Sequence, residues 1–199
     1  MPRLVLNLAS VSSFSSPLIV PNTGGFMNPD AIVESFNLQP GMKVADFGSG
    51  SGYFTILMAK KVGDSGQVTA VDILESALET VRAKGSVSGL KNLETIRADL
   101  EVLGGSGLPD SSQDVVLLAN ILFQSSKKMD IVNEAKRVLV SGGLVIFIDW
   151  KRGANGGLGP PENLRVDPAE MKAALENQGL RFVSDIDAGI FHFGFIYRK

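Results

Sequence analysis

The sequence predicts an α/β fold: a three-layer sandwich whose mostly parallel, seven-stranded sheet ends in an antiparallel strand. Three observations carry this prediction. From residue 41 onward, short runs of strand character alternate with segments of helical periodicity. Glycines gather directly after the first of these runs, at Gly48, Gly50 and Gly52. The last aromatic run, Phe191–Tyr197, follows its predecessor through residues 187–190 alone, a connection too short for a parallel crossover.

Seven runs have the length and composition of strands. Each of the first five ends at or just before a glycine or a polar residue, as buried parallel strands commonly do. In the seventh, every other residue is aromatic, which indicates a strand with one apolar face and supports antiparallel pairing. The runs are Lys43–Phe47, Gln67–Val71, Leu93–Arg97, Asp114–Ala119, Leu144–Asp149, Phe182–Ile186 and Phe191–Tyr197.

Four segments between these runs have apolar residues at helical spacing. We expect Gly142 and Gly143 to stop the third helix. The fourth helix begins at Asp167–Glu170, which supplies an acidic N-cap, a proline at the first helical position and a glutamate three residues after the cap. The four predicted helices are Tyr53–Val62, Glu75–Lys84, Lys127–Val140 and the segment from Asp167 to Gly179.

Composition narrows the functional classes. The chain of 199 residues has 19 Lys+Arg against 21 Asp+Glu, a net charge of -2, which disfavours a nucleic-acid partner without excluding one. It has no cysteine, so disulfides, thiolate metal sites and cysteine nucleophiles are excluded. Because His192 is the only histidine, a multi-histidine metal site is excluded too, and we expect no metal.

The length predicts one domain, which we place at residues 26–199, preceded by an N-terminal arm over residues 1–25. The arm has no acid, one arginine and a cluster of serines, a composition that some targeting segments share. We interpret it instead as an arm that leads into the domain and serves as part of a lid. No apolar run reaches the length of a membrane span, and we expect a cytoplasmic protein.

The segment Val44–Tyr53 has the pattern of a strand, a glycine turn and a helix. Such a turn places backbone N–H groups and the positive helix end beside a ligand, at the sheet edge where open α/β sheets bind ligands. The dinucleotide pattern requires a small third residue where this chain has Tyr53. Asp46 precedes the turn; its carboxylate would repel a pyrophosphate but suits a ligand with an ammonium group. A nicotinamide oxidoreductase is therefore disfavoured.

The run from Asp46 to Gly52, Asp-x-Gly-x-Gly-x-Gly, resembles motif I of the class I S-adenosylmethionine (SAM) methyltransferases. Segments downstream resemble the same family, and its nearest branch is the small prokaryotic methyltransferases related to the ubiquinone and menaquinone biosynthesis enzymes. The resemblance covers about residues 26–199 and implies a Rossmann-like methyltransferase fold, with SAM as cofactor and S-adenosylhomocysteine as product. The downstream segments are Asp72, Ala98-Asp99-Leu100, Leu108–Asp114, and Arg137–Leu139 followed by Gly142-Gly143.

This resemblance also implies a set of cofactor-binding residues. Asp72 would accept hydrogen bonds from the ribose hydroxyls, and Asp99 would bond the adenine amino group with Leu100 packed on the ring. Asn120, at the end of the fourth strand, would lie beside the methionine part of the cofactor. The full set is Asp46, Gly48, Ser49, Gly50, Gly52, Asp72, Ile73, Asp99, Leu100 and Asn120.

Two residues are candidates for a catalytic base. His192 is the one side chain that normally titrates near neutrality, and it lies on the opposite strand face from Phe191, Phe193 and Phe195. Its alternative role is that of a structural histidine. Asp149 ends the fifth strand at the ligand edge, where it could orient an acceptor, act as base, or simply cap a loop.

The acceptor side is expected to include Phe26, Phe123 and Trp150. An indole can stack on a flat acceptor or lie near the sulfonium, although packing is its more common role. The segment Lys151–Asp167 is long for a loop in a compact domain and is rich in glycine and proline. We predict that it forms a lid together with Phe26 and Met27.

The function that follows is methyl transfer from SAM to an acceptor by in-line displacement at the sulfonium methyl carbon, which depends mainly on orientation. Because the sequence shows no separate substrate domain, the acceptor is either small or docks on an open face, and a small molecule is the leading expectation. The absence of cysteine excludes cysteine-dependent cytosine and arsenite methylation, and Asn120–Phe123 lacks the paired prolines typical of nucleic-acid amine methyltransferases. Two alternatives stay open: a methyltransferase acting on RNA or protein, and a catalytically silent binding module.

Overall fold

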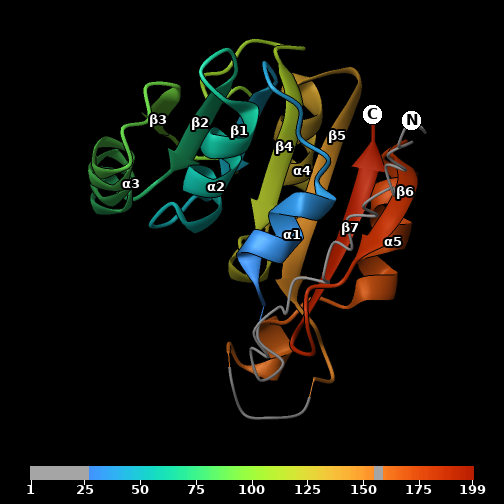
Figure 1. Ribbon diagram of the computed structural model, residues 1–199. Helices are drawn as coiled ribbons and strands as arrows, with labels where there is room; N and C mark the ends of the chain where they lie inside the picture. Colours follow the sequence, from blue (N-terminus) through green and yellow to red (C-terminus); the bar gives the residue numbers. More distant parts are fainter. Residues whose placement is uncertain (1–26, 155–158) are drawn as a thin grey trace, which may run out of the picture.

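The computed structural model describes residues 27–154 and 159–199. Its strands are β1 (Lys43–Phe47), β2 (Gln67–Asp72), β3 (Leu93–Arg97), β4 (Gln113–Ala119), β5 (Leu139–Trp150), β6 (Arg181–Ile186) and β7 (His192–Arg198). They form one seven-stranded sheet in the order β3-β2-β1-β4-β5-β7-β6 (Figure 1). Strands β1 to β5 pair in parallel, and β7 pairs antiparallel with both β5 and β6. The predicted sheet, including its antiparallel last strand, is confirmed.

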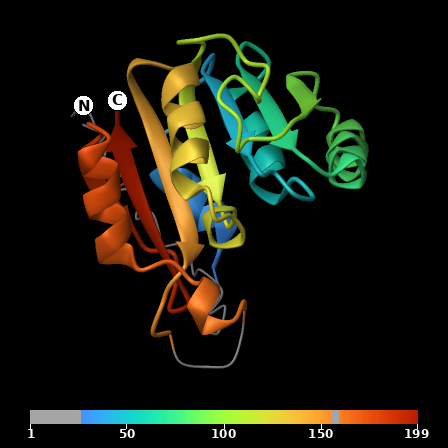
Figure 2. The same cartoon turned by 180° about the vertical axis from the view of Figure 1, so that it is seen from behind.

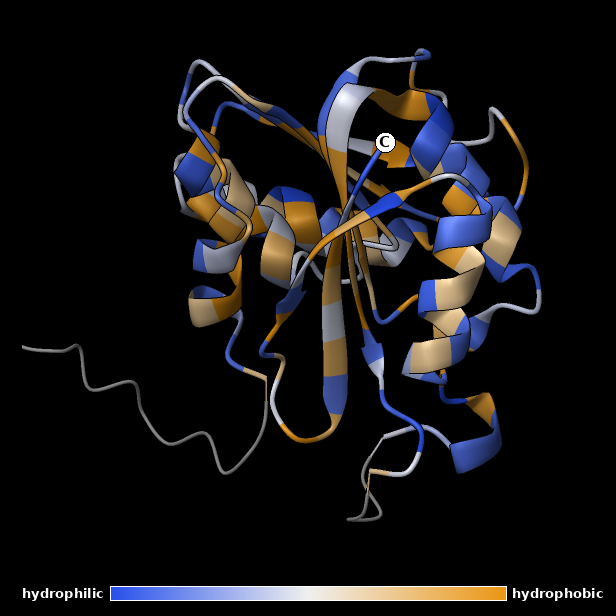
Figure 3. Cartoon of the chain, turned by 90° about the vertical axis from the view of Figure 1, so that its right-hand side faces the viewer, coloured by the Kyte–Doolittle hydropathy of each residue, from blue (hydrophilic) through white to orange (hydrophobic). Residues whose placement is uncertain are grey.

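The helices are α1 (Pro29–Ser35), α2 (Tyr53–Val62), α3 (Glu75–Val87), α4 (Lys128–Val138) and α5 (Pro168–Asn177), with 3-10 turns η1 (Leu122–Gln124) and η2 (Glu162–Leu164). Helices α1, α2 and α3 cover one face of the sheet, and α4 and α5 cover the other (Figures 1 and 2). In a side view, hydrophobic residues gather along the strands between these two layers (Figure 3). The predicted three-layer sandwich is confirmed.

Two local predictions need correction. The third predicted helix does not continue to the glycine pair: α4 ends at Val138, and Leu139 already pairs with Gln113 of β4. Gly142 and Gly143 therefore lie inside β5, where Gly142 has φ +79° and its N–H bonds the Lys199 carbonyl. Strand pairing on both sides of β5 outweighs the helical periodicity of this segment.

Helix α1 was not predicted from the sequence, because it is only seven residues long. Pro29 occupies its first turn, and the Asn28 side chain accepts a hydrogen bond from the Ala31 N–H at 3.4 Å. Its apolar side places Ile32 and Val33 in the core beside α2. The domain therefore has a helix over the carboxyl half of the sheet, close to the strand ends that bind ligands in such folds.

A buried charged network anchors the long loop that precedes β4. The Glu134 carboxylate of α4 is completely buried and accepts hydrogen bonds from the Gly104 N–H (2.6 Å) and the Ser106 N–H (3.0 Å). Arg137 pairs with the same carboxylate and with Asp110. Burial alone would raise the pKa of Glu134, but the hydrogen bonds to its ionised carboxylate outweigh burial and lower the pKa to about 2.

The predicted arm over residues 1–25 and Phe26 lie outside the described residues, as do residues 155–158 of the predicted lid. The rest of the segment Lys151–Asp167 runs from β5 to α5 and includes η2 and a bridge between Lys151 and Val166. The predicted N-cap of α5 is confirmed: the Asp167 carboxylate accepts hydrogen bonds from the Ala169 and Glu170 N–H groups. The lid itself stays a prediction.

Candidate active site

The glycine turn between β1 and α2 requires glycine for two separate reasons. Gly48 has φ +73°, and a Cβ built there would lie 2.5 Å from Cδ1 of Ile121. Gly52 has φ +78°, and its Cβ would lie 2.8 Å from Cγ2 of Val81. Gly50 also has a positive φ, but nothing lies within 4 Å of its Cβ position. The backbone at Gly50 is therefore open to a ligand, while Gly48 and Gly52 shape the turn.

Asp72 ties this turn to the end of β2. Its Oδ2 accepts a hydrogen bond from the Gly50 N–H at 2.8 Å, and its Oδ1 accepts one from the Leu74 N–H at 2.9 Å. Each carboxylate oxygen has two acceptor positions, so both can take a further hydrogen bond from a ligand hydroxyl. The chain thus places an acid with free acceptor capacity beside the open backbone of Gly50.

A cavity of about 410 Å³ is lined by Asp72 and by the backbone of Gly50. It brings together six of the predicted cofactor residues, which come from the glycine turn and from the ends of β2 and β3. They are Gly48, Gly50, Asp72, Ile73, Asp99 and Leu100. The remaining wall combines apolar side chains such as Ile121 and Ile131 with the polar side chains of Glu101, Gln124 and Ser125, a mixture that suits a nucleoside. Gly52 does not line it and acts through the turn.

A second cavity of about 480 Å³ adjoins the first, and Gly48, Gly50 and Gln124 line both. It contains the other three predicted cofactor residues, Asp46, Ser49 and Asn120. Two of their buried side-chain atoms, Ser49 Oγ and Asn120 Oδ1, have no hydrogen-bond partner within residues 27–154 and 159–199. Buried polar atoms without partners are rare in native proteins, so this cavity fits a ligand with polar groups of its own.

Asp46 is the buried acid of this second cavity. Its Oδ2 accepts a hydrogen bond from the Thr55 hydroxyl at 2.5 Å. Burial raises the pKa of Asp46 to about 7, and the nearby charge of Asp72 adds to the effect, while the bond from Thr55 opposes it. A cationic ligand group would stabilise the ionised form. In the described part of the chain no cationic side chain pairs with Asp46, which fits its predicted role of binding an ammonium group.

Asn120 and Gln124 shape the wall at the end of β4. Asn120 has a positive φ of +55°, and its N–H bonds the Ile148 carbonyl. The Gln124 amide donates to the Asn120 carbonyl at 2.8 Å. Sequence reasoning missed Gln124, because its position depends on the η1 turn rather than on a motif. The left-handed backbone of a non-glycine residue is a common mark of a functional site.

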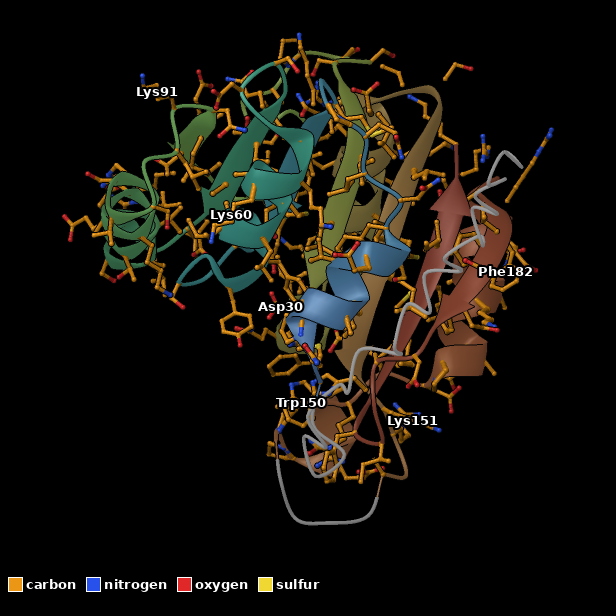
Figure 4. All side chains as sticks on the ribbon, viewed as in Figure 1. Asp30, Lys60, Lys91, Trp150, Lys151 and Phe182 are labelled. Atoms are coloured by element: carbon orange, nitrogen blue, oxygen red, sulfur yellow. The ribbon has the colours of Figure 1, made fainter. Side chains whose placement is uncertain are left out.

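Trp150 and His192 form the far side of the second cavity. They are direct partners in the β5–β7 register, and their ring centroids lie 4.1 Å apart. Trp150 lies at the edge of the sheet where β5 ends (Figure 4). The Arg165 guanidinium lies 5.9 Å from the Trp150 ring centroid, and Gly159 leaves room for that ring. Burial, assisted by the charge of Arg165, lowers the pKa of His192 to about 4.

Asp149 lies on the opposite face of β5 from Trp150 and lines neither cavity. Its Oδ2 accepts from the N–H groups of Leu122 (3.0 Å) and Phe123 (3.2 Å), and its Oδ1 accepts from the Trp150 N–H. Burial raises its pKa to about 6, with these bonds opposing the shift. This geometry fixes η1 against the end of β5. Phe123 lines a third cavity between η1 and η2, and Phe26 lies outside the described residues.

Sequence order, sheet order and site chemistry together define a class. A glycine turn follows β1, acids follow β2 and β3, and a second polar cavity holds a buried acid for a cation. With an antiparallel strand inserted between β5 and β6, this is the architecture of a class I SAM-dependent methyltransferase. The unpartnered Ser49 and Asn120 atoms and the uncompensated Asp46 fit the amino-acid part of SAM.

Comparison with known proteins places the chain in that class. The family model of the methyltransferase domain matches residues 38–184, and the chain belongs to this family. Its cofactor is S-adenosylmethionine. A solved structure of a SAM-dependent methyltransferase from Aquifex aeolicus is similar to it, with a TM-score of 0.79, 28% identity, and 90% of this chain and 93% of that chain covered.

Curated relatives add a narrower similarity. The ubiquinone/menaquinone biosynthesis C-methyltransferase UbiE of Shewanella sediminis is 33% identical over 121 residues, covering 60% of this chain and 47% of the relative. UbiE of Azotobacter vinelandii is 30% identical over 128 residues, covering 64% and 49%. The chain therefore spans about half the length of the curated relatives it matches.

Membrane-spanning helices and metal-binding clusters are both absent from the described residues. No helix there is long and apolar enough to cross a membrane. Within residues 27–154 and 159–199, no group of three or more His, Asp or Glu side chains is placed to hold a metal ion.

Proposed function

We propose that this protein transfers a methyl group from SAM to a small-molecule acceptor whose reacting part is a flat ring. The observation that carries the proposal is the pair of adjoining cavities: one suits a nucleoside, and the other holds a buried acid and two unpartnered polar atoms. The names of the UbiE relatives support the finer part, because they are C-methyltransferases of quinone biosynthesis.

The first cavity would hold the adenosine part of the cofactor. Asp72 would accept hydrogen bonds from the ribose hydroxyls with the acceptor positions left by Gly50 and Leu74. Asp99 stands at the other end, where its carboxylate can accept from the adenine amino group. Leu100 is buried beneath the cavity and offers an apolar surface for the base. These roles match the residues that the resemblance implied.

The second cavity would hold the amino-acid part. Asp46 would be ionised and would pair with the ammonium group, which removes the penalty of burying that carboxylate alone. The Ser49 hydroxyl and the Asn120 amide oxygen supply further hydrogen bonds. When bound, the cofactor supplies a methyl group on a positively charged sulfur that is already a good leaving group. The protein's share of catalysis is then orientation and the exclusion of water.

The acceptor side of the second cavity is aromatic and apolar. Tyr53, Phe54 and Trp150 line it together with Met27. These side chains bind flat rings through apolar contact and stacking, and their surfaces exclude water from the methyl group. The described residues thus give a flat ring a place beside the cofactor's reacting end.

Calorimetry tests the cofactor part directly. Purified protein is titrated with S-adenosylhomocysteine, with SAM and with NADH, and the two sulfur ligands are expected to bind while NADH does not. The Asp72→Ala variant removes the ribose acceptor, and we expect it to weaken binding at least tenfold, about 1.4 kcal/mol. Asp64→Ala is the matched control, because Asp64 is an exposed acid outside both cavities.

Activity is then measured as transfer of labelled methyl from SAM to flat-ring phenols and quinols, with bulk RNA and casein as alternative acceptors. Labelling of the small rings alone supports the proposal. Labelling of RNA or casein in place of the rings would assign a macromolecular acceptor. Absence of S-adenosylhomocysteine binding up to about a millimolar, near -4 kcal/mol, would overturn the proposed function as a whole.

A further inference from the structure

The second cavity contains the only tryptophan and the only histidine of the 199-residue chain, in contact with each other. His192 is 6% exposed, and it lines the cavity along with Asp46 and Asn120. Among the described residues, neither ring nitrogen, Nδ1 or Nε2, has a hydrogen-bond partner. The imidazole is thus a buried polar group that faces the place where the acceptor would lie.

An unpartnered imidazole is unusual, because a neutral ring carries one N–H donor and one nitrogen lone pair. A structural histidine in a core ordinarily satisfies at least one of them with a neighbour. Here the Trp150 ring packs on the imidazole at an interplanar angle of 41°, which holds the ring in place without using either nitrogen. The residues that the structure describes therefore leave the hydrogen-bonding capacity of both nitrogens unused.

Burial first, and the charge of Arg165 second, keep this ring neutral. Arg165 lies behind Trp150, and its positive charge opposes protonation of His192. Asp46 and the Tyr53 hydroxyl belong to the same cavity, and Asp149 lies on the far face of β5 with its carboxylate bonded to backbone N–H groups. With burial added, the pKa of His192 falls to about 4, so the ring has a free lone pair at neutral pH.

Resting on the proposed methyl transfer, we propose that His192 is a catalytic residue that accepts the proton the acceptor loses when it is methylated. The bond between sulfur and the methyl carbon breaks, and its electron pair stays on sulfur. The methyl carbon bonds to the acceptor atom, and the acceptor's X–H bond gives its proton to an imidazole nitrogen, which later releases it to water. No further reactant is needed.

Charge balance in the cavity favours this route. Before transfer, the positive charge sits on sulfur beside a neutral imidazole; afterwards sulfur is neutral and the imidazolium carries the charge. The buried cavity therefore keeps its net charge through the step, which avoids the cost of creating a new buried charge. Asp149 is less suited to the role, since three backbone N–H groups already occupy its carboxylate and it lines neither cavity.

Because the chain has one histidine, its imidazole C–H signal in an NMR spectrum of tag-free protein reports His192 alone. We expect this signal to stay unchanged between pH 8 and pH 5.5 in the complex with S-adenosylhomocysteine. A titration centred near the ordinary value of 6.5 that S-adenosylhomocysteine leaves unchanged would show a ring exposed to bulk water, and it would contradict the buried position on which the proposal rests. Trp150 fluorescence is expected to stay constant over the same pH range, because its ring packs on the imidazole.

Ligand contact is tested with two probes that share a ring, 1-naphthol and 1-methoxynaphthalene. Only the naphthol has an O–H that can donate to the imidazole, so we expect it to shift the His192 signal and to bind at least tenfold more tightly. Equal affinities with an unmoved His192 signal would overturn the proposal. Failure of S-adenosylhomocysteine to bind is a separate result, which would count against the proposed function instead.

Two variants separate chemistry from packing. His192→Gln keeps a hydrogen-bonding side chain but cannot take up a proton, whereas His192→Phe keeps the ring contact with Trp150 alone. With an acceptor found in the labelling assay, we expect both to lose about 10²- to 10⁴-fold in kcat while S-adenosylhomocysteine affinity stays within about twofold of wild type. Retention of full kcat in His192→Gln would reduce His192 to a positioning residue and contradict the proposal.

Discussion

Replacing Asp46 with asparagine is expected to stabilise the protein while abolishing cofactor binding. Asp46 is buried at the end of β1, and in the part of the chain that the structure describes its carboxylate receives hydrogen bonds from the hydroxyl and the backbone of Thr55. Its ionised form is needed to pair with an ammonium group, yet without ligand that form lies in a poorly solvating site. The Asp46→Asn side chain has nearly the same shape, stays neutral, and keeps an oxygen that can accept from Thr55.

The magnitude follows from the pKa of Asp46, which rises from 3.8 to about 7 on folding. A raised carboxyl pKa means that the unfolded state releases its proton first, so the wild-type free energy of unfolding falls as the pH rises from about 4 to 7. Above pH 7 both states are ionised and the loss is complete. We expect Asp46→Asn to exceed wild type by about 4 kcal/mol at pH 8 and by about 2 kcal/mol at pH 5.

Urea denaturation of both proteins at pH 5 and pH 8, without cofactor, measures this difference. Asp64→Asn serves as the control, because Asp64 is exposed and its substitution should change stability little at either pH. A second series with S-adenosylhomocysteine should raise the wild-type midpoint and leave Asp46→Asn unmoved. A stability difference that is the same at both pH values would refute the reasoning about Asp46.

Three further predictions concern the site and the fold. Below pH 7, wild-type affinity for S-adenosylhomocysteine should fall about tenfold per pH unit in calorimetry, because protons compete for Asp46, and a flat profile would contradict this. Gly48→Ala combines a positive φ with a clash against Ile121, so we expect at least a tenfold loss of affinity in the same assay; unchanged binding would refute the tight turn. Glu134→Gln should destabilise the protein by about 3 kcal/mol at pH 7 and by about half that at pH 3, because the stability that comes from a lowered carboxyl pKa is lost on acidification. Urea denaturation measures both differences. A difference between variant and wild type that is the same at pH 3 and pH 7 would contradict the role given to the ion pair with Arg137.

The cofactor cavities could be predicted because their residues sit at fixed places in local motifs. The glycine turn fixes the start of α2, and acids at strand ends meet at one edge of a parallel sheet whatever the loops do. The resemblance to the methyltransferase motifs implied Asp72 and Asp99 one by one, and the structure places both in one cavity. The antiparallel last strand was predicted on equally local grounds, from a connection too short to cross over.

The acceptor side was less predictable, because it depends on register between distant strands. Trp150 and His192 were each noted in the sequence, but only the pairing of β5 with β7 brings their rings into contact. The sequence left Asp149 open as an acceptor-orienting group, a base or a loop cap, and only the fold shows that the η1 turn supplies donors to its carboxylate. The β5 boundary was missed for a similar reason, since pairing of Leu139 with Gln113 overrides local periodicity.

The pairing of β1 with β4 has a consequence for how the protein acquires its fold. The Lys43 N–H bonds the Asp114 carboxylate across a separation of 71 residues, and the two strands are neighbours at the centre of the sheet. Such non-local contacts carry a large loop-closure entropy and form slowly. The seam also divides the cofactor cavities, with the glycine turn on one side and Asn120 on the other. A ligand that contacts both sides of this β1–β4 pairing would bind the native sheet and not the separated strands, and it would therefore stabilise the centre of the fold.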